Sequence, residues 1–80
     1  MTAHNLKIYP EYYEAVTSGA KTFELRFNDR NYHVGDTLRL REYVPHTQTY
    51  TSRETTVTVT YILESVTGLQ DGYCILGITP

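Results

Sequence analysis

The chain has little of what small proteins use to reinforce a fold covalently or with a metal. Its 80 residues include one cysteine, Cys74, so no internal disulfide can form and no disulfide partner is expected. Cys74 and the three histidines, His4, His33 and His46, lie far apart and lack the spacing of metal ligands. We therefore expect no metal site and no cofactor, and we expect each histidine to be solvated.

No stretch is long and apolar enough to span a membrane, and no signal peptide or internal repeat is visible. A lone thiol suits a reducing environment, so the sequence predicts a cytoplasmic protein without a membrane partner. Phosphate-cradling glycine loops and the GxSxG motif of serine hydrolases are also absent. The length suffices for one small core, and we expect residues 1–80 to form a single domain.

Positive charge is scarce overall but unevenly distributed. The formal net charge is −2, whereas proteins that coat a nucleic-acid backbone usually carry a clear basic excess. Residues 21–53 nevertheless contain six Lys and Arg against four Asp and Glu. This distribution favours a local site for an anion over general electrostatic wrapping of a polyanion.

Hydrophobic periodicity predicts a mainly β domain with one or two short helices. A first strand over Leu6–Tyr9 precedes a helix over 10–19, in which Pro10 suits the first turn and Gly19 a left-handed end. The apolar face of this helix holds Tyr12, Ala15 and Val16.

Four more strands are expected, over residues 22–27, 37–43, 54–64 and 72–78. In the first of these, Phe23, Leu25 and Phe27 share one side and Thr22, Glu24 and Arg26 the other. In the third, one side holds Val57, Val59, Tyr61 and Leu63. Five strands and one helix are too few for a two-layer α/β fold. The sequence therefore predicts a small barrel of about five strands, with the helix plugging one opening.

The stretch GAKTFELRFNDR, residues 19–30, is the one concentrated signal for a site. Glu24 and Arg26 are two apart on a strand and should project from the same face about 7 Å apart, with Lys21 at the helix-to-strand junction. One interpretation is a solvated strand face with weak ion pairs. The other is a cleft floor, partly covered by the helix, that binds an anion and accepts hydrogen bonds from a base or amide.

Flanking residues extend the candidate cleft. Arg41, like Arg39, lies on a neighbouring polar face, and Asp29 and Arg30 follow the strand as a loop at its lip. For Asp29 a turn cap is the simpler interpretation. The chain also has eight tyrosines. We expect Tyr12, Tyr61 and Tyr73 mainly in the core, and consider Tyr32, Tyr43 and Tyr50 for stacking on a base.

The segment SGAKTFELRFNDRNYHVGDTLRLREY resembles the signature of the ASCH domains, a branch of the PUA-like β-barrels. Their hallmark Gly-x-Lys-x-x-Glu-x-Arg is matched by Gly19, Lys21, Glu24 and Arg26. With the VGD turn and the closing DGYCILGI, the chain also resembles a short single-domain branch catalogued as a domain of unknown function. The resemblance covers nearly the whole chain and implies a PUA-like barrel whose signature residues line a cleft beside the helix.

The resemblance implies RNA or a modified nucleotide as the partner. On this hypothesis the ligand-binding residues are Lys21, Glu24, Arg26, Asp29, Arg30 and Arg41. The alternative is a small hydrolase, similar to amidohydrolases of the family, that acts on a modified nucleoside through Lys21, Glu24 and Arg26. Those hydrolases have Thr at the position of Glu24, so a copied mechanism does not transfer directly. A protein–protein adaptor is the third alternative, and the sequence leaves the oligomeric state open.

Overall fold

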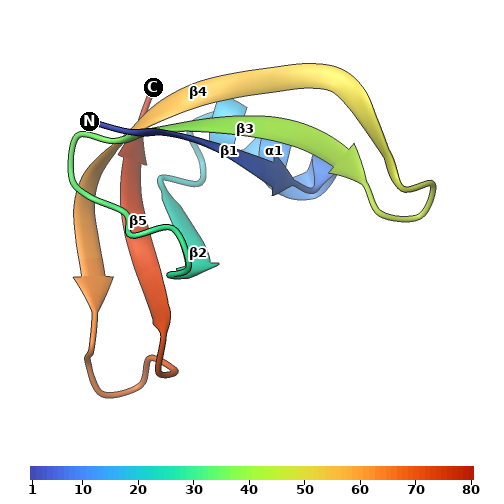
Figure 1. Cartoon of the computed structure of the whole chain (residues 1–80). Helices are drawn as coiled ribbons and strands as arrows, with labels where there is room; N and C mark the ends of the chain where they lie inside the picture. The colour runs from blue at the N-terminus through green and yellow to red at the C-terminus, as the bar shows by residue number, and fades with distance from the viewer.

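The longest element is a 16-residue strand, β4 (Thr49–Glu64), whose bend gives the sheet its curvature (Figure 1). The computed structural model describes residues 1–80 and contains one helix and five strands. The remaining elements are β1 (Ala3–Ile8), α1 (Pro10–Thr17), β2 (Phe23–Phe27), β3 (Thr37–Val44) and β5 (Tyr73–Thr79). The expected elements are all present. β1 begins earlier than predicted, at Ala3, and β4 begins at Thr49 instead of residue 54.

The strands form one mixed sheet in the order β1-β3-β4-β5-β2. β1 pairs with β3 in parallel, and the other three pairs are antiparallel. The first part of β4 pairs with β3 and its last part with β5, so β4 joins both parts of the sheet. A single row of paired residues crosses four strands where these parts meet, through Ala3, Thr37, Thr58 and Thr79.

The sheet is a half-barrel, and the closure into a complete barrel that the sequence suggested does not occur. β1 and β2 are its two edges, and no backbone pairing joins them. β2 has only five residues and pairs along one side alone, with β5. Closure is left to a side chain, because Arg26 Nη2 on β2 donates to the Lys7 carbonyl on β1 at 2.7 Å.

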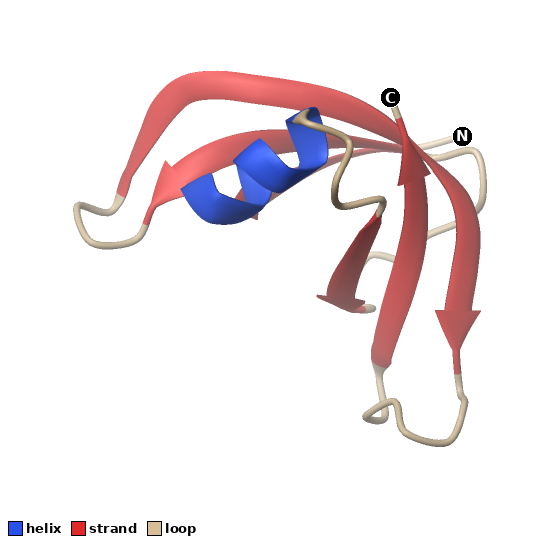
Figure 2. Ribbon diagram, turned by 180° about the vertical axis from the view of Figure 1, so that it is seen from behind, coloured by secondary structure: helices blue, strands red, loops and turns tan.

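The core is made by alternate residues of the strands together with one face of α1, which lies within the curve of the sheet (Figure 2). Tyr13 and Val16 are the buried residues of the helix. The expectation that Tyr12 belongs to the core is wrong, since it is 48% exposed. Tyr13 takes the inner position, where its hydroxyl donates to the Glu54 carbonyl at 3.3 Å. α1 is the single helix, and it is too short and too polar to cross a membrane.

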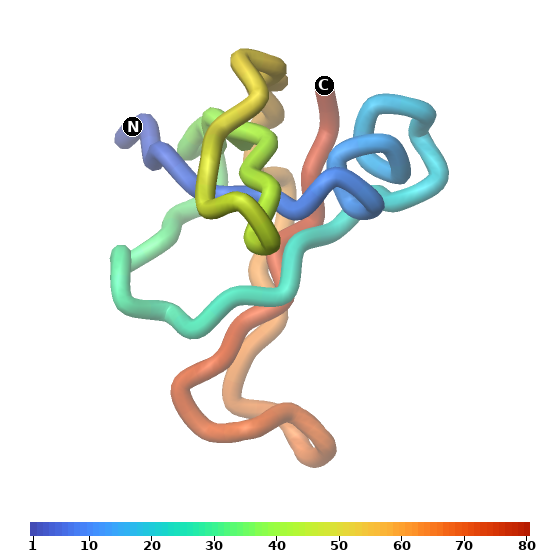
Figure 3. Tube along the Cα trace, turned by 90° about the vertical axis from the view of Figure 1, so that its right-hand side faces the viewer, coloured from blue at the N-terminus to red at the C-terminus, as the bar shows by residue number.

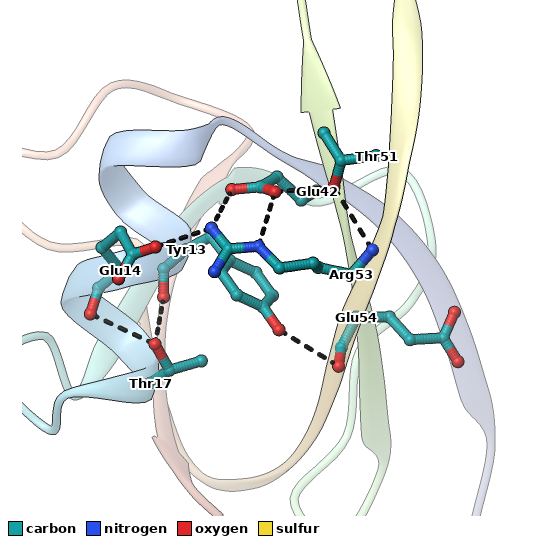
Figure 4. A network of polar contacts seen from close by, with 7 residues as sticks. All are labelled: Tyr13, Glu14, Thr17, Glu42, Thr51, Arg53 and Glu54. Carbon is teal, nitrogen blue, oxygen red and sulfur yellow. Dashed lines mark hydrogen bonds and ion pairs between the residues drawn. The ribbon is translucent and has the colours of Figure 1, made fainter.

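Arg53 on β4 fastens α1 to the sheet (Figure 4). Its Nη2 donates to Glu14 of the helix at 2.6 Å and to the buried Glu42 of β3 at 2.8 Å. The guanidinium lies over the Tyr13 ring, 4.6 Å from its centroid. Hydrogen bonds from Arg53 and from the Thr51 hydroxyl lower the pKa of Glu42 from an ordinary 4.5 to about 2. The helix is therefore held by a charged network as well as by apolar packing.

The faces of β2 are reversed relative to an ordinary amphipathic strand. Glu24 is 4% exposed, whereas Phe23, Leu25 and Phe27 are each about half exposed. The interpretation of a solvated polar face is therefore wrong for this strand. A buried carboxylate is tolerated because two cations from the same segment reach it.

A β-bulge between Val59 and Tyr61 breaks the expected alternation in β4. Val57 and Val59 are buried as predicted, but Tyr61 is 64% exposed and Ile62 packs against the core in its place. A bulge inserts one extra residue, so every following side chain changes face. The prediction of Tyr61 as a core residue is wrong for this reason.

His4 is buried rather than solvated. Its Nε2 lies 2.9 Å from Asp36 Oδ2, and its ring meets Tyr32 edge-on with centroids 4.8 Å apart. Asp36 also accepts main-chain N–H groups of Thr2 and His33. These bonds, that of Thr2 foremost, hold the pKa of Asp36 well below its usual range. The pair ties the start of β1 to the turn that precedes β3.

Candidate functional site

The candidate site is the gap between the two free edges of the sheet, β1 and β2. Arg26 crosses this gap to the Lys7 carbonyl, and two hollows share both residues in their linings. The larger hollow has a volume of about 910 Å³ and lies between α1 and β2, where it is lined by Tyr12, Lys21 and Glu24 among others. The smaller hollow, of about 330 Å³, includes Asp29, Arg30 and Arg41.

The end of α1 positions the first residue of the motif. Gly19 has φ of +84°, a left-handed conformation that stops the helix at little steric cost. The Lys21 N–H then donates to the Ala15 carbonyl at 2.9 Å, which turns the chain back toward the sheet. Lys21 thus lies two residues before β2. Its side chain reaches the start of that strand, where Nζ donates to the Phe23 carbonyl at 2.7 Å.

Lys21, Glu24 and Arg26, called the triad below, form a closed set of charged hydrogen bonds. Glu24 Oε1 accepts from Lys21 Nζ, and Oε2 accepts from Arg26 Nε and Nη2 at 3.1 and 2.9 Å. The Glu24 side chain is 5% exposed, while those of Lys21 and Arg26 are 17% and 25% exposed. Both cations therefore shield the carboxylate and present their outer sides to solvent.

The triad still has donors to offer a ligand. An ammonium has three N–H groups and a guanidinium has five. Lys21 uses two bonds, to Phe23 and Glu24, and Arg26 uses only Nε and Nη2. One N–H of Lys21 and those of Arg26 Nη1 are left without a protein partner. The triad thus lines the larger hollow with side chains that keep N–H groups available to a ligand.

Aromatic side chains line the larger hollow together with the triad. They are Tyr9, Tyr12, Phe23 and Tyr43. Tyr9, Tyr12 and Phe23 are each nearly half exposed, and Lys21 Nζ lies over the Tyr12 and Phe23 rings, 5.6 and 5.2 Å from their centroids. An apolar hollow with a few convergent polar groups is the usual form of a small-molecule site.

The smaller hollow is basic. Lys7, Arg26, Arg30 and Arg41 line it against one carboxylate, Asp29, and because Arg26 is already paired with Glu24 the remaining excess is two positive charges. The loop of residues 28–36 makes a wide arc from β2 toward β3 and contributes Asp29 and Arg30 (Figure 3). The Arg41 guanidinium lies over the Tyr50 ring, 4.1 Å from its centroid. Lys7 Nζ lies over Tyr43 at 4.3 Å, with no carboxylate in contact.

The structure brings all six predicted ligand-binding residues to this cleft. Lys21, Glu24 and Arg26 line the larger hollow, and Arg26, Asp29, Arg30 and Arg41 line the smaller. Of the stacking candidates, Tyr43 lines the larger hollow and Tyr50 the smaller. Tyr32 also lines the smaller hollow, but it is a core residue and only 5% exposed. Arg39 is directed elsewhere and pairs with Glu54 through two bonds, at 3.0 and 2.8 Å.

Sequence reasoning missed Lys7. Like Arg26 it lines both hollows, yet in the sequence it is one polar residue on an alternating strand. Lys7 reaches the site because β1 pairs in parallel with β3 and leaves its other edge open. The sequence does not show this strand order, so it gave no signal for Lys7. No group of three or more His, Cys, Asp or Glu side chains lies close enough to hold a metal ion.

All residues that line the cleft lie within a region that matches a known protein family. Residues 3–78 match the family described as "Domain of unknown function (DUF3850)". The "Uncharacterized 12.9 kDa protein in GpA 3'region" of Escherichia phage P2 is 35% identical over 68 residues, which are 85% of this chain. The chain spans 61% of the length of that relative. On these matches, the chain belongs to the DUF3850 family, a domain of unknown function.

Proposed function

We propose that this protein is a binding module of ASCH type, within the PUA-like superfamily, that holds RNA or a nucleotide between β1 and β2. The observation that carries the proposal is the convergence of Lys21, Glu24 and Arg26 on a hollow of about 910 Å³. Their spacing is that of the Gly-x-Lys-x-x-Glu-x-Arg signature, and they line a cleft beside the helix, as the resemblance to ASCH domains implies.

The chemistry of the larger hollow suits a nucleobase. Tyr and Phe rings offer faces on which a base stacks, worth about 1–3 kcal/mol per base. The unpartnered N–H groups of Lys21 and Arg26 suit the carbonyl and ring-nitrogen acceptors of a base edge. Single-stranded RNA is commonly read in this manner, with splayed bases stacked on aromatic side chains.

Hydrolysis is supported less well than binding. The larger hollow is lined by no Ser, Thr, Cys or His, and Glu24 is its single carboxylate. Both oxygens of Glu24 are already bonded to Lys21 and Arg26, so no residue there stands ready as an unoccupied base. A nucleophile and a separate base within hydrogen-bond reach are what such chemistry requires.

Titration of the ¹⁵N-labelled protein with the four nucleoside 5′-monophosphates and with short single-stranded RNA tests the proposal. We expect amide shifts to cluster at residues 7–9 and 21–26. Tyr12→Ala should weaken binding about tenfold through lost stacking. Tyr61→Ala is the matched control, because Tyr61 is 64% exposed and lies outside both hollows.

The same samples separate binding from catalysis. A folded protein that binds none of these ligands removes the proposal. Deacylation of an added acylated nucleoside, lost in Lys21→Ala, would instead establish the hydrolase.

A further inference from the structure

Three of the four cations of the smaller hollow, Lys7, Arg30 and Arg41, have no short ion pair within the protein, whereas Arg26 is paired with Glu24. Arg41 Nε is 4.0 Å from Glu54, and Arg30 Nε is 4.0 Å from Asp29, distances at the limit of an ion pair. Glu54 is instead engaged by Arg39 through two shorter bonds. Lys7 contacts only a tyrosine ring. With the paired Arg26 left out, three cations face one lining carboxylate, Asp29, and in a protein of net charge −2 this excess of two positive charges points to an anionic ligand.

The cations reach this hollow from separate elements. Lys7 comes from β1, Arg26 from β2, Arg30 from the loop that follows β2, and Arg41 from β3. Charges supplied from several sides surround a compact group, whereas a row along one strand would follow an extended backbone. Guanidinium groups also offer paired N–H donors that match the oxygens of a phosphate.

Neutral donors complete the hollow. Tyr32 is 5% exposed and its hydroxyl has no partner in the protein, yet no polar side-chain atom is both fully buried and unpaired. The hydroxyl is therefore not sealed inside the core, and Tyr32 is one of the residues that line the hollow. Burial raises the pKa of this phenol above its ordinary 10.0, so the group is an O–H donor at neutral pH.

The edge of β1 adds main-chain N–H groups. The Lys7 carbonyl faces β2, away from β3. Because main-chain directions alternate along a strand, the N–H groups of Asn5 and Lys7 face the same open edge. Asn5 and Lys7 both line the smaller hollow. Unpaired amides at a sheet edge are recognised contributors to anion sites.

We propose that the smaller hollow binds the terminal phosphate of a nucleotide, a phosphate monoester, while the larger hollow takes the base. The identity of the ligand as a nucleotide rests on the function proposed above; the anion site rests on the hollow itself. A monoester carries a charge of about −1.5 to −2 at neutral pH, which matches the excess of two better than the single charge of a diester does. Arg26, which lines both hollows, would contact both parts of the ligand.

Binding constants measured by calorimetry for four probes test the proposal. They are a nucleoside 5′-monophosphate, the same nucleoside, a dinucleoside phosphate without a terminal phosphate, and inorganic phosphate. We expect the monophosphate to bind at least tenfold more tightly than the nucleoside or the dinucleoside phosphate. Inorganic phosphate should bind weakly and compete with the monophosphate.

Two variants of the same strand locate the site. Arg41→Gln and Arg39→Gln each remove one positive charge from β3, but only Arg41 lines the hollow. We expect Arg41→Gln to weaken the monophosphate about tenfold and Arg39→Gln to leave it within twofold, with Lys7→Gln as a second variant on β1. Thermal unfolding of each variant confirms that it is folded.

The outcomes distinguish the two proposals. If nucleotides bind but neither Arg41→Gln, Lys7→Gln nor the terminal phosphate affects affinity, the phosphate site is wrong and the nucleotide module stands. If inorganic phosphate binds with the expected Arg41 dependence but no nucleotide does, the anion site stands and the nucleotide module falls. If no probe binds, both are wrong.

Discussion

Glu24 is the residue in which charge and burial are most closely linked. An isolated carboxylate at this depth would be costly, but Lys21 and Arg26 supply three donors to its two oxygens. Both partners lie within three residues of it in the sequence, so the segment brings its own counter-charges into the fold. The same three residues present the cleft with its donors, and stability and recognition therefore share one structure.

Glu24→Gln should lower the free energy of unfolding by about 2–3 kcal/mol, because it leaves Lys21 and Arg26 facing each other without a counter-charge. Urea denaturation at neutral pH measures the change. Glu64→Gln is the control, with an expected change below about 0.5 kcal/mol, since Glu64 is exposed and accepts only one long bond from Asn28. Equal losses in the two variants would show that the triad adds no stability.

Sequence reasoning located the triad because its members are close along the chain. Residues 19–30 show its spacing, Asp29 and Arg30 follow it directly in the chain, and Arg41 was expected on a neighbouring polar face. The sequence did not show which face of β2 is buried. Alternation gives two faces, and the usual rule places the apolar face inward. Here Glu24 occupies the inner face because Lys21 and Arg26 pair with it, and hydrophobic periodicity does not reveal that pairing.

At the scale of elements, α1 has only eight residues, too few for a helix to be stable alone. Its last turn carries no basic residue, and its attachment depends on Arg53 from β4, some forty positions away. Glu42 of β3 and Glu14 of the helix accept from the same guanidinium. The helix, in turn, forms one wall of the larger hollow through Tyr12 and Ala15. Arg53, Glu14 and Glu42 thus hold the helix that forms this wall, although none of the three lines the hollow itself.

Acid should weaken this attachment in a defined range of pH. The pKa of Glu42 is about 2 in the folded protein and 4.5 ordinarily. Its contribution to stability is therefore complete above pH 4.5 and is lost as the pH falls toward 2. Urea unfolding at several pH values should show a smaller acid loss in Glu42→Gln than in the parent protein.

Some acid sensitivity should remain in that variant, because the pKa of Asp36 is also held below its ordinary value. Glu11→Gln, which alters an exposed residue of α1 without an ion pair, should leave the pH dependence unchanged. An identical acid loss in Glu42→Gln and the parent would contradict the assignment.

Two glycines at the ends of elements allow backbone strain to be separated from packing. Gly19 and Gly72 have nearly equal φ, +84° and +83°. A Cβ at Gly19 meets nothing within 4 Å, whereas one at Gly72 lies 2.7 Å from the Phe27 ring. Gly19→Ala should therefore cost about 1 kcal/mol from conformation alone.

Gly72→Ala should cost more, since it also displaces Phe27 from its edge-on contact with Tyr73. Equilibrium unfolding of both variants, repeated in a Phe27→Ala background, checks this reasoning. There the two costs should become equal. A difference that persists without the Phe27 ring would assign the extra cost to some other part of the turn.

At the scale of the whole molecule, the half-barrel leaves a gap that is bridged by one hydrogen bond from Arg26 to the Lys7 carbonyl. Arg26 also contacts Glu24, and only a guanidinium has separated N–H groups that reach both acceptors. The width of the cleft is thus set by a residue that also lines both hollows.

Arg26→Lys should retain the pairing with Glu24 but lose the bridge to β1. We expect amide hydrogen exchange to become faster along β2 and the open edge of β1. Exchange between β3 and β4, whose ladder does not involve Arg26, should stay unchanged. Faster exchange throughout the sheet would instead indicate that the bridge supports global stability.

The architecture was predictable to the level of its strands and no further. Alternating patterns indicated five strands and a helix ended by Gly19, and the structure confirms them. The pairing of His4 with Asp36 links positions 32 apart and leaves no local trace. The bulge after Val59 likewise occurs within an unbroken run of strand-forming residues. Both follow from tertiary contacts that sequence periodicity does not record.

The row of residues from Ala3 through Thr37 and Thr58 to Thr79 has a consequence for how the chain can be rearranged. Three inter-strand steps place its outer members roughly 14 Å apart, a span that about five extended linker residues cover. A circular permutant, joined there and opened at the turn of residues 45–48, would keep every strand pair intact. Opening it within β4 would divide the strand that both parts of the sheet share, so the hairpin turn is the permissive place for new termini.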